Sequence, residues 1–153
     1  MKLRVWVEAR SAKKNEMSPD DMVMFAAVSK LDEKGKTVNF YGTVGSKNDL
    51  ITRGWLKVSR RELDPVESTE WHPVQLGSSE KLLKPGEVVP VEIELYPSST
   101  FFSAGESIQV ILASDEIITS PPYRKSALIN NGLHVLHFGG QYDSFLQIPV
   151  IPQ

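Results

Sequence analysis

Apolar residues recur at every second position along most of this chain, and this period of two constrains its fold more than any other feature. Near the N-terminus, Leu3, Val5 and Val7 alternate with charged or aromatic residues. Turn-forming Gly, Pro and Ser residues interrupt the alternation every eight to fifteen residues. Helical spacing is rare, and Pro65 interrupts the stretch 62–69, which could form a short turn. The pattern predicts strands at residues 3–9, 22–31, 37–44, 51–58, 88–95, 107–114, 133–138 and 144–149.

Strands that follow one another without intervening helices are typical of a β-sandwich or barrel rather than of βαβ units. The chain has 153 residues, the length of one ordinary domain, and 41% of them are hydrophobic, which is enough for a packed core. We therefore predict one all-β domain over residues 1–153. Because the first strand begins almost at the first residue, we expect the chain to be a fragment of a longer protein.

Charge and residue usage exclude several classes of partner. The 17 basic and 19 acidic residues are mixed along the chain and leave a formal net charge of -2, so we expect neither nucleic-acid nor membrane-surface binding. The longest apolar run, 22–28, is only seven residues, far short of a membrane span. The absence of cysteine excludes disulfides and thiolate metal sites, and it suits a cytoplasmic location.

No catalytic or metal site can be recognised in the sequence. The pentapeptide GESIQ, around Ser107, lacks the closing glycine of a nucleophile elbow, and Ser107 begins a strand whose Ile108, Val110 and Leu112 share one face. His134 and His137 are three residues apart, a spacing that directs them to opposite faces of a strand. We therefore expect no catalytic residue, no cofactor and no metal ion in this chain.

The stretch RGWLKVSRRELDP, residues 53–65, combines an apolar patch with a charged cluster. We expect the bulky residues of Gly54-Trp55-Leu56 to pack inward from a strand, as we expect of Trp6. Arg60, Arg61 and Glu62 follow where that strand ends. Arginine suits bidentate pairing across an interface, so these three residues could dock the domain on another one. Alternatively, they are solvated or pair within the domain, because most surface ion pairs contribute little.

Several segments, read in order, resemble one known family. They are RGWLKVSRRELDP, WHPVQL, LLKPGEVVPVEIELYPSSTFFSAGESIQVIL and NNGLHVLHFGGQYDSFLQIPVIP. Together they resemble the C-terminal domain of the CocE/NonD serine hydrolases, which include X-Pro dipeptidyl-peptidases, bacterial cocaine esterase and related acyl esterases. The resemblance covers residues 3–152 and departs most from the family pattern at 114–131. It implies a jelly-roll β-sandwich of the galactose-binding-domain-like type.

The resemblance also implies a non-catalytic role for this chain. In the family, the serine, aspartate and histidine of the triad lie in an α/β-hydrolase domain that precedes this one, and no position here corresponds to them. The chain alone is then not an enzyme, while the parent protein is a dipeptidyl-peptidase or esterase. We expect the domain to pack on the upstream hydrolase domain and to shape substrate access or homo-oligomerisation. The alternative is a free-standing carbohydrate-binding module. The candidate interface residues are Trp55, Arg60, Arg61, Glu62, Trp71 and Tyr123.

Overall fold

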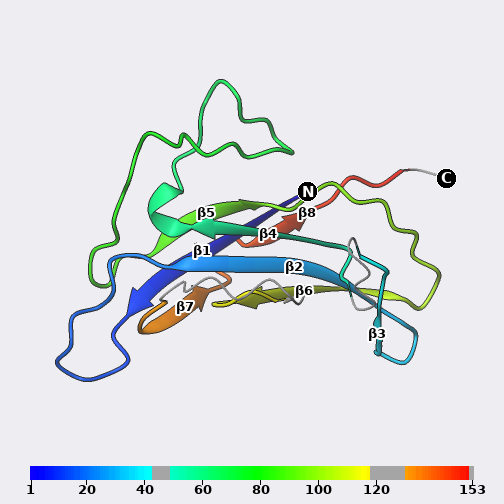
Figure 1. Cartoon of the computed structure of the whole chain (residues 1–153), viewed down its shortest axis with the longest axis horizontal. Coiled ribbons are helices and arrows are strands. Elements are labelled where there is room, and N and C mark those ends of the chain that lie inside the picture. The colour runs from blue at the N-terminus through cyan, green and yellow to red at the C-terminus, as the bar shows by residue number, and fades with distance from the viewer. Residues whose placement is uncertain (43–48, 118–129, 152–153) are drawn as a thin grey trace.

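Two antiparallel β-sheets face each other and form nearly the whole fold (Figure 1). The computed structural model describes residues 1–42, 49–117 and 130–151. Each sheet contains four strands, and within the described residues the only helical element is a 3-10 turn at Val58–Arg60. No helix in these ranges has the length and apolar character needed to cross a bilayer. The prediction of an all-β sandwich is confirmed, whereas its finer jelly-roll, galactose-binding-like classification stays a prediction.

The first sheet, sheet A, is built around β1 (Lys2–Arg10). On one edge of β1 lies β5 (Val89–Glu94), and on the other lie β7 (Leu133–His137) and β8 (Phe145–Gln147). β7 pairs with the C-terminal half of β1, and β8 pairs with its first residues. The first strand in sequence is therefore the central strand of its sheet.

The second sheet, sheet B, is built around β2 (Val23–Leu31). On one edge lie β4 (Thr52–Lys57) and the short β3 (Thr37–Val38), and on the other lies β6 (Ser107–Ala113). β2 has partners on both edges along most of its length. The side chains of β2 are buried on both faces of the sheet over much of that length.

The core lies between the two sheets and is supplied by alternate residues of the strands. On β1, Leu3, Val5 and Val7 point inward and are nearly inaccessible to solvent. Removing such side chains from water supplies the main stabilising free energy, roughly 2 kcal/mol for each large aliphatic residue. The remaining buried core residues are Ala9, Met22, Met24, Ala26, Val28, Leu56, Val58, Leu83, Val89, Val91, Ile93 and Leu95.

The two lateral sides of the sandwich differ. At the closed side, where β4 meets β5, the backbones approach so closely that a Cβ on Gly54 would lie 1.8 Å from the Glu94 carbonyl oxygen. The Tyr96 amide donates to the Arg53 carbonyl there at 3.2 Å, and the Thr52 hydroxyl donates to the Tyr96 carbonyl at 2.6 Å. At the open side, β6 and β7 flank a groove between the sheets. Among the described residues, a main-chain hydrogen bond between the two sheets is present at the closed side, from Tyr96 to Arg53.

Seven of the eight predicted strands are observed with bounds that differ by at most two residues. The prediction of a strand over 37–44 is wrong beyond Val38 for the residues that the structure describes, 37–42. The cause is a change of partner, because Phe40 exchanges backbone hydrogen bonds with Asp49, at 3.0 and 2.9 Å, instead of with β2.

Candidate functional site

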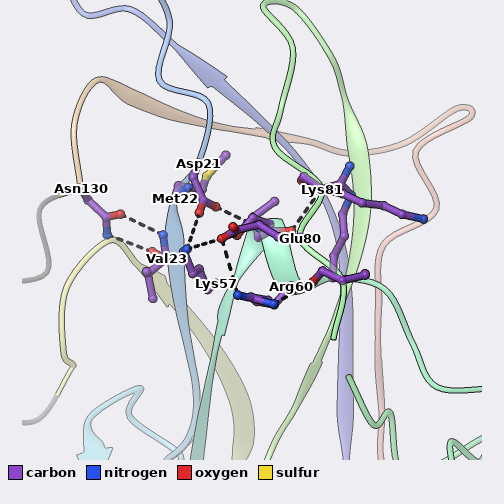
Figure 2. A network of polar contacts seen from close by, with 12 residues as sticks. Asp21, Met22, Val23, Lys57, Arg60, Glu80, Lys81 and Asn130 are labelled. Atoms are coloured by element: carbon purple, nitrogen blue, oxygen red, sulfur yellow. Dashed lines mark hydrogen bonds and ion pairs between the residues drawn. The ribbon is translucent and has the colours of Figure 1, made fainter. Parts of the chain in front are cut away.

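The charged segment that follows β4 is tied to a loop of the same domain (Figure 2). Arg60 Nη1 donates to the carbonyl oxygens of Gly77 and Ser79, at 2.8 and 3.1 Å. Its other terminal nitrogen, Nη2, lies 3.8 Å from a carboxylate oxygen of Glu80. About 38% of the Arg60 side chain stays exposed, so the guanidinium holds the loop and still borders solvent.

Arg61 and Glu62 fasten the same loop from its other side. Arg61 Nη1 donates to the carbonyl oxygens of Val58, at 3.2 Å, and Lys81. The Glu62 carboxylate accepts a hydrogen bond from the Ser79 hydroxyl and forms an ion pair with Lys81 Nζ at 2.9 Å. These contacts fit the pairing-within-the-domain alternative for Arg60, Arg61 and Glu62. A docking role for them stays a prediction.

Asp21 lies at the end of sheet B where β2 begins and β4 ends, and it is connected to this loop through Lys57 (Figure 2). Its Oδ1 accepts the backbone amides of Met22 and Ser59, each at 2.9 Å, and its Oδ2 lies 3.2 Å from Lys57 Nζ. Lys57 Nζ also donates to Glu80 at 2.8 Å. Burial raises the pKa of the Asp21 carboxyl, but the hydrogen bonds from Ser59, Met22 and Lys57 outweigh burial and lower it below its ordinary value.

The network gives a pH-dependent stability that Asp21→Asn tests. Because the folded pKa of Asp21 is depressed, its stabilising contribution is present above the unfolded pKa of about 3.9 and is lost as pH falls through the folded value. We expect Asp21→Asn to lower the unfolding free energy by about 2 kcal/mol at pH 7. Below pH 5, the unfolding free energy of this variant should fall less steeply than that of the wild type. Urea titrations from pH 7 to pH 3 measure both. Asp20→Asn, at the exposed neighbouring position, is the control and should keep the wild-type slope.

Trp55 lies on the outer face of sheet B and not in the core, which corrects the expectation that it packs inward. Its indole is 53% exposed, while the adjacent Leu56 is 5% exposed, because successive residues of a strand point to opposite faces. The Trp55 ring packs edge-to-face on Tyr96, with centroids 5.8 Å apart. Phe25, the partner of Trp55 on the central strand, and Ala27 face the same side of sheet B and are buried. We call Trp55, Tyr96, Phe25 and Ala27 the outer patch.

Trp71 lies over the other sheet. The loop that carries it, 63–76, is held to the outer face of sheet A by His72, whose Nε2 is 3.1 Å from Glu94. Gln147 of β8 also donates to Glu70 of the loop at 2.9 Å. The Trp71 indole is 47% exposed. Trp55 and Trp71 therefore lie over the outer faces of different sheets. Tyr123 lies outside the described residues.

The outer face of sheet A holds a buried carboxylate that the sequence analysis missed. Glu8 is 4% exposed, accepts two hydrogen bonds from Arg10 at 2.7 and 2.8 Å, and lies 2.9 Å from His137 Nε2. The bond from Arg10 lowers the pKa of the Glu8 carboxyl, burial opposes that shift, and the contact with His137 lowers the pKa again. The alternation of β1, which places Glu8 opposite the core face, was the signal available in the sequence.

Trp6 shares that outer face, so its expected place in the core is wrong. Its indole Nε1 donates to the Asp143 carboxylate at 3.1 Å, and its ring packs edge-to-face on Tyr142, with centroids 5.5 Å apart. Tyr142 also contacts His137, at 5.0 Å between ring centroids. The cluster fixes the turn between β7 and β8 on sheet A.

The two histidines of β7 do not form a common site. His134 is opposite inward-facing Ala9, whereas His137 is opposite outward-facing Trp6, so the two histidines lie on different faces of β7. Across residues 1–42, 49–117 and 130–151, no three His, Asp or Glu side chains converge on a common point as metal ligands would. The polar networks that are present hold strands and loops together.

Comparison with known proteins gives one family and one group of structures. The model of the X-Pro dipeptidyl-peptidase C-terminal non-catalytic domain matches residues 1–147. Two crystal structures of a CocE/NonD family hydrolase from Staphylococcus aureus are similar to the chain, with 37% and 38% sequence identity and TM-scores of 0.83 and 0.82. Each alignment covers 94% of this chain but only 26% of the solved chain, so this chain spans about a quarter of those structures. No curated protein matches the sequence.

Proposed function

Because this chain belongs to the family of X-Pro dipeptidyl-peptidase C-terminal non-catalytic domains, we propose that it docks on the catalytic α/β-hydrolase domain of a longer polypeptide. There it shapes access to a serine hydrolase active site that acts on a peptide, ester or amide, or it supports the assembly of several such polypeptides. The similar Staphylococcus structures support this proposal, since a chain like this one forms only 26% of each. No comparison favours the alternative of a free-standing carbohydrate-binding module.

The outer patch is the observation that carries the docking proposal. Trp55 and Tyr96 are large aromatic side chains that stay 53% and 48% exposed, and Trp and Tyr are enriched among residues that dominate interface energetics. Trp55 lies in β4 beside its cross-strand partner Phe25, which is buried together with Ala27, so the patch is anchored on sheet B.

Charged side chains border the outer patch and supply the polar rim that interfaces usually have. Lys57 lies two residues beyond Trp55 on the same face of β4, and it pairs with Glu80. Arg60, next to Glu80, keeps part of its guanidinium at the surface. A contact between domains commonly buries about 600–1,500 Å², so we expect the docked surface to extend from Trp55 to this rim.

Trp55→Ser tests docking when its effect is measured in two forms of the protein. In the chain 1–153 alone, the substitution removes the contact with Tyr96, and we expect a loss of about 1 kcal/mol. In the complete polypeptide it also removes a buried anchor between domains, so we expect an additional loss of about 2 kcal/mol and a lower kcat/KM. Denaturant titration and hydrolysis of X-Pro-p-nitroanilide or p-nitrophenyl acetate measure these effects.

Tyr41→Ser is the control, because Tyr41 is 84% exposed away from the patch, and it should cost little in either form. Equal losses for Trp55→Ser in the two forms would contradict docking through the outer patch. The same comparison decides the predicted docking role of Arg60 and Arg61. An alanine substitution that costs the same in both forms assigns each arginine to the 77–81 loop alone.

A further inference from the structure

The inner face of the sandwich is solvated at its open side. Ile108 and Val110 of β6 are 42% and 40% exposed. They lie opposite Lys30 and buried Val28, so they share the core face of sheet B. At the closed side, the equivalent inner residue Ile93 of β5 is 0% exposed. Apolar side chains on the core face of a strand stay this exposed only where the sandwich is incomplete beside them.

In the described part of the chain, the main chain of β6 is also unpaired along the edge that faces away from β2. Among the described residues, β6 pairs with β2 alone. In an antiparallel strand the N–H and C=O of one residue point to the same neighbour. The Val28 carbonyl accepts the Ile51 amide beside β4, at 3.0 Å, so Val28 points away from β6. Val110, opposite Val28, therefore directs its N–H and C=O to the free edge, and Ile108 and Leu112 do the same.

A groove of about 330 Å³ lies between the C-terminal end of β6 and β7. None of the lining residues that the structure describes is charged, and they include Leu112 from β6 and His134 and Leu136 from β7. His134 Nδ1 is buried with no hydrogen-bond partner in the described part of the chain. The lining that the structure describes is therefore mainly apolar, and His134 adds a buried polar atom without a described partner, which is costly in a folded protein.

We propose that an extended, alternately apolar segment of the same longer polypeptide, outside residues 1–153, adds as a strand to the free edge of β6 and fills this groove. The main chain of the added strand forms hydrogen bonds with the main chain of Ile108, Val110 and Leu112, as in β-strand addition. The inward side chains of the added strand cover the side chains of these three residues. This inference rests on the part of the proposed function that places residues 1–153 in a longer polypeptide. The solved Staphylococcus chains, of which this chain covers 26%, supply the length of polypeptide outside the domain.

The geometry favours one added strand over a second copy of the domain. The groove is lined by residues of both sheets, so an added strand that follows β6 would lie beside side chains of β7 as well. In a second copy of the domain, β6 is hydrogen-bonded to β2. If that β6 paired with the free edge, its whole sheet would have to come with it. An exposed edge with apolar residues is a site of unwanted pairing, and an added strand from the same polypeptide removes that hazard.

The first test places a photo-crosslinking amino acid, p-benzoylphenylalanine, at position 110 of the complete polypeptide. The matched control carries it at position 109, where Gln109 points to the outer face of the same strand. We expect position 110 to cross-link to a peptide outside residues 1–153 and position 109 not to do so. Cross-links from position 110 to residues within 1–153, to a second copy, or to nothing would each overturn the proposal.

The second test uses the unmodified complete polypeptide and measures amide hydrogen exchange. We expect the amides of Ile108, Val110 and Leu112 to be protected to within about tenfold of those of Gln109 and Ile111, which face β2. Exchange of the first three amides more than about a hundredfold faster would overturn strand addition.

The two proposals can fail separately. A probe at position 55 that cross-links to the hydrolase domain, combined with unprotected β6 amides, overturns strand addition and leaves docking in place. Protected β6 amides and an outside cross-link from position 110, without any cross-link from position 55, support strand addition and contradict docking through the outer patch.

Discussion

Gly54→Ala is expected to lower the unfolding free energy of the domain by about 3 kcal/mol or more. A Cβ at position 54 would lie 1.8 Å from the Glu94 carbonyl oxygen and 2.9 Å from its carbonyl carbon, and both atoms belong to the main chain. Main-chain atoms of a paired strand cannot rotate away as a flexible side chain can. The substitution must therefore separate β4 from β5 and break the hydrogen bond between Tyr96 and Arg53.

Denaturant titration of Gly54→Ala measures this loss, and Gly86→Ala is its control. Gly86 has a φ of +77° and nothing within 4 Å of an added Cβ, so alanine there meets only the strain of the left-handed conformation, about 1 kcal/mol. The clash predicts a clearly larger loss at position 54. A loss at position 54 no larger than that at position 86 would show that the two strands are not in such close contact.

Ile93→Ala is expected to cost about 2–5 kcal/mol, the range for removing a large aliphatic side chain from a packed core. Ile93 is 0% exposed and lies on the inner face of β5 at the closed side. Ile108→Ala makes the same chemical change on the inner face of β6, where the side chain is 42% exposed. In the chain 1–153 alone, Ile108→Ala should cost less than about 1 kcal/mol, because the side chain loses little burial.

The ratio of these two losses is the informative result. In the chain 1–153 it should be large, and in the complete polypeptide it should shrink, because an added strand would bury Ile108. Unfolding free energies of both variants in both forms give the comparison. Equal costs for Ile93→Ala and Ile108→Ala in the chain alone would mean that the open side is already closed without any added segment.

Strand positions could be predicted from the sequence because the period of two is a local property of the chain. The stretch around Leu3, Val5 and Val7 shows it directly, and β1 forms there. Strand pairing could not be predicted in the same way, because β1 finds its partners near residues 90, 135 and 146. The early end of β3 likewise depends on Phe40 choosing Asp49 as its partner, which no local pattern encodes.

The family could be recognised from the order of several motifs, whereas the geometry of the site could not. The alternation that buries Leu56 already required Trp55 to face outward, so this error came from weighting apolar character above period. The partners of Arg60 and Arg61 are main-chain carbonyls about twenty residues away, and a sequence does not show which loop will return to them. Glu8 was missed because a charged residue inside a strand is usually solvated, and its burial depends on Arg10 and on His137 of another strand.

The central position of β1 in sheet A sets a waiting time during synthesis. Lys2 pairs with Glu94 on one edge and with Gln147 on the other, so the first strand to be made needs partners from the end of the chain. At roughly 5–20 residues per second, β1 leaves the ribosome on the order of ten seconds before β8 exists. Until β5 has been made, β1 has no strand of sheet A to pair with, whereas β2 and β4 can already pair with each other. Sheet B therefore has the first opportunity to form, and β1 is the strand of this domain that waits longest for its full set of partners.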